Sequence, residues 1–215
     1  MIKLSDKDRP LVYAITDGRG TDDLFPDTLV KITRQVAEAV DEDVSMVQIR
    51  EKHLSGRHLF ELASACVAIT RGSRTNLLIN DRADIASAAG ADGVHLTGTS
   101  IPASVVRSSF GSDLLIGVST HTGEEALAAR REGADFVVYG PVFETPGKGS
   151  PIGTGQLNLL CSALAPFPVI ALGGIDAMNC GTVIRAGVAG VAGIRSFTNR
   201  AAFRTLQNSL QHGWS

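Results

Sequence analysis

The feature that most constrains the fold of this sequence is a regular alternation of short apolar runs with longer stretches of helical periodicity. Eight runs rich in β-branched and other apolar residues cover 11–15, 45–49, 76–80, 93–96, 114–118, 135–140, 167–172 and 190–194. Between them, apolar residues recur at helical spacing in 28–40, 56–70, 123–133 and 177–187. Strand and helix therefore alternate along the chain, which indicates an α/β fold.

Most of the expected strands are continuous apolar runs, not alternations of apolar and polar residues. Such strands are typical of a parallel sheet that is buried on both faces by helices. Eight units favour a single (β/α)8 TIM barrel over an open sheet, which normally stops at about five strands. We expect one barrel domain over 1–215, because no linker or change in composition divides the chain.

Composition excludes several classes of partner. The chain has 20 Lys and Arg against 22 Asp and Glu, a net charge of -2, so no broad positive surface is expected for nucleic acid or an anionic membrane. No apolar run reaches the roughly 18 residues of a membrane span, and the first ten residues lack the apolar segment of a secretory signal. We therefore expect a cytoplasmic protein whose anion sites are local.

Two residue types that often form covalent or metal sites have simpler interpretations here. Cys66, Cys161 and Cys180 are odd in number, widely spaced and set among apolar or small residues, which favours core packing over a disulfide. The five histidines show none of the spacings of a zinc site. Glycines 90, 133 and 187 each end a helical stretch shortly before a strand, where a left-handed helix terminus needs glycine.

In a (β/α)8 barrel, function lies at the carboxyl ends of the strands, so the residues that follow each apolar run are the candidates. Gln48, Arg50 and Lys52 follow the second run and share one side of an extended chain. An amide and two cations in this arrangement suit an oligophosphate, because Arg offers a planar fork and Lys a point charge. The alternative is a solvated charged loop with ordinary ion pairs.

The third and fifth runs are followed by further polar residues. Asn80 and Asp81 place an amide and a carboxylate where Mg²⁺ could join protein and phosphate, although a turn or helix cap would also explain them. Ser119 is a candidate hydrogen-bond donor, and Thr122 is expected to cap the next helix. His121 is a candidate acid or base.

The longest loop, 140–155, follows the sixth run and contains five glycines, three prolines and a single lysine, Lys148. Its backbone N–H groups and Lys148 could bind an anion, and we expect a functional lid in preference to a surface excursion. Gly173 and Gly174 follow the seventh run and Ile194 and Arg195 the eighth, where barrels often hold a phosphate monoester. Two anion pockets at one mouth predict a reaction between two phosphorylated molecules.

Seven motifs in order along the chain carry a family resemblance: YAITD (13–17), QIREK (48–52), LINDR (78–82), DGVHL (92–96), GVSTH (117–121), YGPVFETPGK (139–148) and ALGGI (171–175). Together they strongly resemble the thiamine phosphate synthases and their sister group, the TenI-like thiazole tautomerases. The resemblance implies a transferase of thiamine biosynthesis. In its reaction, hydroxymethylpyrimidine diphosphate ionises to pyrophosphate and a pyrimidinylmethyl cation, which the nitrogen of thiazole phosphate captures.

The resemblance also implies site residues. The catalytic cations are Arg50, Lys52 and Lys148. The substrate-binding residues are these three together with Gln48, Ser119, Thr145, Gly173, Gly174 and Ile194. We add Asn80 and Arg195 from their positions after the third and eighth runs. Within this set, Ser119 corresponds to a diphosphate-contacting serine and Thr145 to a loop threonine near the thiazole phosphate. Asp81 corresponds to one of two Mg²⁺-binding aspartates, and a homodimer is the expected assembly.

Three positions depart from the synthase pattern. Ser100 stands where the second metal-binding aspartate is usual, so Mg²⁺ would bind more weakly or catalysis would depend more on the three cations. Gly147 replaces a usual threonine. Arg195 stands where a small serine is common, and would either strengthen phosphate binding or block the thiazole.

Two alternatives to the synthase stay open at this point. A thiazole tautomerase would also lack this aspartate, and it would also carry the VFET motif. The catalytic histidine of that branch, however, is replaced here by Pro141. The other alternative is a noncatalytic regulatory homologue that binds phosphate ligands.

Overall fold

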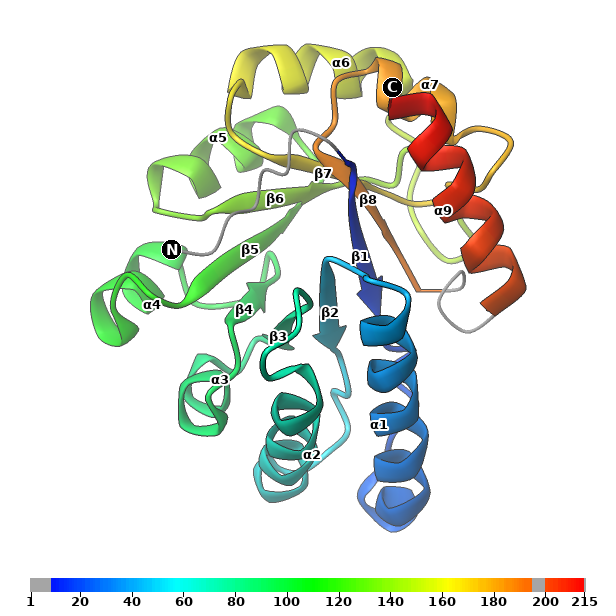
Figure 1. The fold of residues 1–215 in the computed structure, drawn as a ribbon. Coiled ribbons are helices and arrows are strands. Elements are labelled where there is room, and N and C mark those ends of the chain that lie inside the picture. The colour runs from blue at the N-terminus through cyan, green and yellow to red at the C-terminus, as the bar shows by residue number, and fades with distance from the viewer. Residues whose placement is uncertain (1–8, 195–199, 215) are drawn as a thin grey trace.

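The strands form a closed parallel barrel in which each strand pairs with its neighbours in sequence and the last pairs with the first. The computed structural model describes residues 9–194 and 200–214. Its strands are β1 (Leu11–Ile15), β2 (Met46–Ile49), β3 (Asn76–Asn80), β4 (Gly93–Leu96), β5 (Leu115–Thr120), β6 (Phe136–Tyr139), β7 (Val169–Leu172) and β8 (Gly190–Gly193). The predicted (β/α)8 TIM barrel is confirmed (Figure 1).

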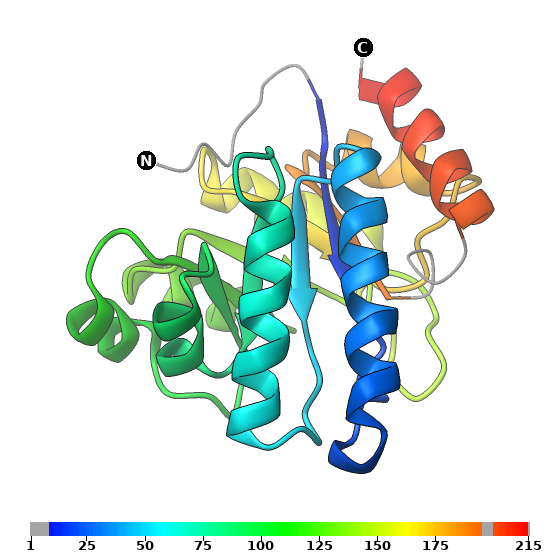
Figure 2. The ribbon, with the colours of Figure 1, turned by 60° about the horizontal axis from the view of Figure 1, so that its bottom comes forward.

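Helices surround the barrel on the outside, as Figures 1 and 2 show. They are η1 (Asp22–Leu24), α1 (Phe25–Asp41), α2 (Gly56–Thr70), α3 (Ala83–Ala89), α4 (Ala103–Phe110), α5 (Gly123–Arg131), α6 (Gly153–Leu164), α7 (Cys180–Arg185) and α9 (Arg200–Trp214). In Figure 2 the arrowheads of β1 and β2 point to the bottom of the view, so the carboxyl ends of these strands face downward there. Among the described helices, none is long and apolar enough to span a membrane.

The local signals at helix ends behave as the sequence predicts. Gly90, Gly133 and Gly187 have φ values of +74°, +92° and +89°. Thr122 caps α5 in a capping box, in which its side chain accepts from the N–H of Glu125 and the Glu125 side chain accepts in return. These signals fix where a helix gives way to the next strand.

The cysteines pack in the core, which confirms the interpretation from their spacing. All three are free and buried. Burial raises the pKa of the Cys66 thiol to about 12 and that of Cys161 to about 11. Neutral thiols of this kind behave as small apolar side chains.

The barrel encloses its own apolar cluster, separate from the larger core between strands and helices. The cluster consists of Leu11, Tyr13, Ile15, Met46, Leu78, Leu115, Phe136, Val138, Ile170 and Ala192. The Phe136 ring occupies the space beside Gly117, where a Cβ atom would lie 2.3 Å from the ring. The rings of Tyr13 and Phe136 meet edge to face with centroids 5.8 Å apart, so aromatic side chains fill the centre of the barrel.

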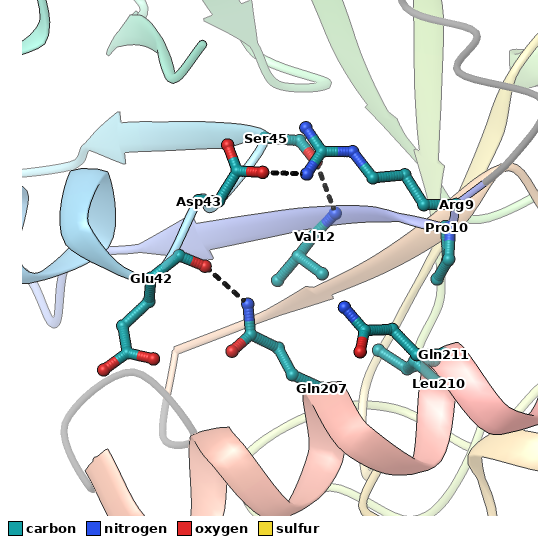
Figure 3. A pocket seen from close by; sticks show the side chains of 9 residues that line it. All are labelled: Arg9, Pro10, Val12, Glu42, Asp43, Ser45, Gln207, Leu210 and Gln211. Atoms are coloured by element: carbon teal, nitrogen blue, oxygen red, sulfur yellow. Dashed lines mark hydrogen bonds and ion pairs between the residues drawn. The ribbon is translucent and has the colours of Figure 1, made fainter. Parts of the chain in front are cut away.

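The second half of α9 lies beside the amino ends of β1 and β2, where residues of these segments line a small pocket (Figure 3). The pocket has a volume of about 60 Å³. Its lining residues come from the start of β1, the segment before β2, and α9: Arg9, Pro10, Val12, Glu42, Asp43, Ser45, Gln207, Leu210 and Gln211. Arg9 pairs with Asp43, and Gln207 donates to the Glu42 carbonyl at 3.0 Å. These contacts join α9 to the face opposite the carboxyl ends of the strands.

Candidate active site

A layer of polar side chains lies at the carboxyl end of the barrel interior. Met46 and Leu78 point into the barrel, so two residues further on Gln48 and Asn80 point inward as well. Gln48 Nε2 donates to Asn80 Oδ1 at 3.0 Å, and both side chains are buried. Asn80 pairs in register with His95 of β4. The sequence placed Gln48 and Asn80 at the barrel mouth, and the structure brings them into contact there.

Asn80 is also hydrogen-bonded to Asp81. Asn80 Nδ2 donates to Asp81 Oδ2 at 2.8 Å, and the N–H of Asp81 donates to the His95 carbonyl at 2.9 Å. Asp81 has a φ of +62°, a left-handed conformation that aspartate tolerates better than most residues. No side-chain cap holds the start of α3, whose N-cap residue is Arg82. Neither Asn80 nor Asp81 therefore caps this helix.

The hydroxyl groups of the β4–α4 loop surround the other oxygen of Asp81. The Ser100 hydroxyl donates to Asp81 Oδ1, and Thr97 Oγ1 lies 3.4 Å from the same oxygen. The N–H of Thr97 donates to Ser100 Oγ at 2.6 Å, which fixes the turn. Asp81 is half-buried, and both of its oxygens are held by neighbouring donors.

The three predicted cations lie in loops beyond the strand ends. Arg50 is half-buried, and its backbone N–H donates to Thr16 Oγ1 at 2.8 Å. Lys52 and Lys148 are exposed. Within residues 9–194 and 200–214, none of the three side chains forms an ion pair. The interpretation of 48–52 as a charged loop with ordinary ion pairs is therefore not supported, and the cations are free to bind an anion.

Glu51 has a structural role that the sequence did not predict. Its carboxylate is 2% exposed and accepts from the N–H of Gly18 at 3.2 Å and of Gly20 at 2.6 Å. A Cβ at Gly18 would lie 3.0 Å from Nη1 of Arg50, so the guanidinium passes close over this loop. Glu51 thereby fixes the β1–α1 loop against the end of β2, next to Arg50. The sequence signal for this role was the alternation of side chains within QIREK. Because successive side chains of an extended segment face opposite sides, Glu51 must face away from Arg50.

The long loop after β6 is ordered at its base by β7. The N–H groups of Val142 and Phe143 donate to the carbonyls of Leu172 and Gly173 at 2.8 and 3.0 Å. The N–H of Ile152 donates back to the Pro141 carbonyl at 2.9 Å, which closes the loop. The Gly140–Pro141 peptide bond is cis. The tip of the loop therefore projects from a fixed base.

Gly173 and Gly174 make room for this loop. Their φ values are +105° and +64°. A Cβ at Gly173 would lie 2.7 Å from Pro141 Cα and 3.2 Å from Thr145 Oγ1, and one at Gly174 would lie 2.8 Å from the Glu144 carbonyl oxygen. The structure thus places Thr145 beside the glycine pair, as expected for one pocket. Ile194 packs against the barrel cluster, whereas Arg195 lies outside the described residues.

His95 is a buried member of the polar layer that the sequence reasoning missed. Nδ1 of His95 lies 3.1 Å from the Tyr13 hydroxyl oxygen, and Nε2 lies 2.8 Å from Ser119 Oγ. Burial lowers the pKa of His95 to about 4; Asp81 opposes this shift and Arg50 adds to it. The ring is therefore neutral at pH 7. A polar residue inside the apolar run 93–96 was the signal that could have revealed it.

The known proteins most similar to this chain agree on one family. Residues 12–197 match the family described as thiamine monophosphate synthase. The chain belongs to this family. A thiamine-phosphate synthase of Chlorobium phaeovibrioides is 39% identical over 212 residues, which cover 95% of this chain and 96% of the relative. One of Chlorobium luteolum is 40% identical, with 81% and 84% covered.

A solved structure gives the same result for the fold. The thiamine phosphate pyrophosphorylase from Pyrococcus furiosus superposes with a TM-score of 0.80 at 29% identity, over 98% of each chain. The barrel of the thiamine monophosphate synthase family thus extends over nearly the whole chain.

Family membership raises the question of whether this chain can hold Mg²⁺. In the described residues, no three His, Cys, Asp or Glu side chains gather as a metal-binding group. Asp81 offers a carboxylate at the mouth, whereas Ser100 offers a hydroxyl that donates to it. Mg²⁺ is commonly held by one or two carboxylates together with substrate phosphates and water. The residues therefore fit a Mg²⁺ ion bound through one carboxylate, with the remaining ligands from outside the protein.

Proposed function

We propose that this chain is a thiamine-phosphate synthase, a transferase of thiamine biosynthesis that joins hydroxymethylpyrimidine diphosphate to thiazole phosphate and releases pyrophosphate. The predicted enzyme, a thiamine-phosphate synthase, is confirmed, because relatives with this name match 95% and 81% of the chain. The family model matches residues 12–197. The structural observation that supports the proposal is that three cations lie in the loops after β2 and β6, at the carboxyl end of the barrel, and form no ion pair within the described residues.

The difficult step is departure of the diphosphate. The bond between the pyrimidinylmethyl carbon and the diphosphate oxygen breaks, and the electron pair leaves with the oxygen. Arg50, Lys52 and Lys148 would stabilise the negative charge that develops on the leaving group. Arg50 is suited to bridging two oxygens, because its guanidinium is planar and its backbone is held by Thr16.

Polar groups of the interior layer would bind and orient the diphosphate substrate. Gln48 and Asn80 are held in one orientation by their mutual hydrogen bond, so little ordering remains to be done on binding. Ser119, a half-buried residue near the end of β5, would add a hydroxyl to this layer. Asp81 would hold Mg²⁺, which when bound supplies positive charge to the diphosphate.

The second substrate would bind at the opposite side of the mouth. Thr145, Gly173 and Gly174 form one packed unit, in which backbone N–H groups can approach a phosphate monoester without obstruction by side chains. Ile194 would complete this pocket, and we assign Arg195 to the same phosphate. The loop after β6 would then close over both substrates and exclude water from the carbocation.

The tautomerase alternative has less support. Pro141 has no titratable group for the proton transfer that such an isomerisation requires. His121 is exposed, and its Nδ1 donates to the Gly140 carbonyl oxygen at 2.5 Å.

The direct test is an end-point assay of the purified protein with both substrates, in Mg²⁺ and in EDTA. We expect equal amounts of thiamine phosphate and pyrophosphate, with more product in Mg²⁺. Arg50→Ala and Lys148→Ala should lose most of the turnover, while Arg57→Ala, an exposed cation on the outer helix α2, should retain it. Absence of product while both substrates raise the melting temperature would instead identify a phosphate-binding protein without this activity.

A further inference from the structure

A buried chain of hydrogen bonds connects the centre of the barrel to its mouth. It runs from Tyr13 on β1 through His95 on β4 to Ser119 on β5, with donor–acceptor distances of 3.1 and 2.8 Å. Tyr13 is 1% exposed and His95 is 2% exposed, whereas Ser119 is half-buried. Only the last member of the chain can therefore touch a ligand.

The direction of the first hydrogen bond follows from the surroundings of Tyr13. Its ring lies in the apolar cluster inside the barrel, against Phe136. Within the described residues, Nδ1 of His95 is the one hydrogen-bond partner of the Tyr13 hydroxyl. A buried hydroxyl that fails to donate is costly, so Tyr13 donates its proton and Nδ1 accepts it.

The second hydrogen bond then has a fixed direction too. A neutral imidazole carries one N–H, and with Nδ1 as the acceptor that N–H is at Nε2. Nε2 therefore donates to Ser119 Oγ. Because Ser119 Oγ accepts this hydrogen bond from His95, the hydroxyl proton of Ser119 points away from His95 and can donate toward the mouth of the barrel.

We infer that Tyr13 and His95 are positioning residues that hold the Ser119 hydroxyl as a hydrogen-bond donor to the departing diphosphate. The inference rests on the proposed function, which places the diphosphate at Ser119. The opposite tautomer would direct the Ser119 proton to Nε2 and turn an oxygen lone pair to the anion. The other groups near the His95 imidazole do not reverse this choice of tautomer. Phe136 and Gly117 are apolar, and the charged groups Asp81 and Arg50 act on the charge of the ring.

The tautomer of His95 can be measured without any substrate. In protein labelled with ¹⁵N-histidine, a long-range ¹H–¹⁵N correlation spectrum distinguishes the protonated ring nitrogen from the unprotonated one. We expect Nε2–H for His95, whose signals are assigned by their loss in His95→Gln. Tyr13→Phe should give a mixture of the two tautomers. An Nδ1–H tautomer in the unmodified protein would overturn the inference.

Binding of inorganic pyrophosphate tests whether the tautomer matters to the site. We expect Ser119→Ala to weaken pyrophosphate binding about tenfold, as for loss of one hydrogen bond to a charged group, and Tyr13→Phe to weaken it about threefold. Tyr13→Phe should have no further effect in the Ser119→Ala background. Independent effects of the two substitutions would overturn the inference. His212→Gln, on an exposed histidine of α9, is the control and should leave affinity unchanged.

Turnover separates this inference from the proposed function. Tyr13→Phe should lower kcat about threefold with an unchanged KM for thiazole phosphate, and His95→Gln, which keeps an amide N–H near the position of Nε2, should retain more activity than His95→Leu. Melting temperatures of the variants check folding. Coupled pyrophosphate binding without product would contradict the proposed function alone, whereas product formation without coupling would contradict the role of Tyr13 and His95 alone.

Discussion

Acidification should destabilise this barrel through His95 before the carboxylates titrate. The pKa of His95 is about 4 in the folded protein against 6.5 for an unperturbed histidine, chiefly because the ring is buried. Between these two values the unfolded chain binds a proton that the folded chain does not. The free energy of unfolding is therefore unaffected above pH 7 and falls as the pH drops from about 6.5 toward 4.

The size of this effect follows from the shift in pKa. The separation between pKa values of about 4 and 6.5, at 1.36 kcal/mol per pKa unit, amounts to about 3 kcal/mol when fully expressed, most of which is lost by pH 4.5. A typical domain has only about 5 to 15 kcal/mol of stability, so the loss should be easy to detect.

Urea unfolding of the metal-free protein in steps from pH 7.5 to 4.5 measures it. His95→Gln should remove most of the pH dependence, whereas His212→Gln should retain it. Burial raises the pKa of Asp92, so protonation of Asp92 increases the free energy of unfolding as the pH falls, opposite to the effect of His95. The quantity to compare is therefore the difference between the parent and His95→Gln. Equal losses of stability in the parent and in His95→Gln would refute the reasoning.

Three further substitutions test the site. Gly174→Ala should cost about 1 to 3 kcal/mol of unfolding free energy in a denaturant titration, because φ is +64° and the new Cβ would lie 2.8 Å from the Glu144 carbonyl oxygen; Gly149→Ala, which has no neighbour within 4 Å, should be nearly neutral. Lys148→Ala should lower kcat/KM for the diphosphate substrate about a hundredfold in a steady-state assay, and an unchanged value would exclude a role in stabilising the leaving group. Ser100→Asp should tighten Mg²⁺ binding about tenfold by calorimetry, because a second carboxylate replaces a hydroxyl; unchanged affinity would place the ion elsewhere.

The barrel could be predicted because its strands are buried on both faces and therefore read as apolar runs. The same rule fails where a strand is polar. β5 continues through Ser119 and Thr120, beyond the predicted end at 118, because these residues keep the ladder with β6 while their side chains are polar. Helix α9 was not predicted either, although its residues Phe203, Leu206 and Leu210 are buried. These three residues recur at helical spacing, so the signal for the helix was present in the sequence.

The candidate site could be located from the sequence but not assembled. Position after a strand end was enough to select Gln48, Asn80 and the three cations. It gave no indication that Ser100 would donate to Asp81, because the two lie 19 residues apart and meet only when β3 and β4 pair. Hydroxyl contacts of this kind leave no periodic pattern in a sequence, so they appear only with the structure.

The interior of the barrel and the candidate site form one unit, and this explains why the most informative residue was missed. Gly117 leaves space for the Phe136 ring, and that ring with Tyr13 keeps the environment of His95 apolar. The apolar environment keeps the imidazole neutral, and the Tyr13 hydroxyl sets which nitrogen carries the proton. Substitution in this aromatic layer should therefore alter the hydrogen-bonding direction at the mouth even when the fold is retained, since the layer acts on Ser119 through His95.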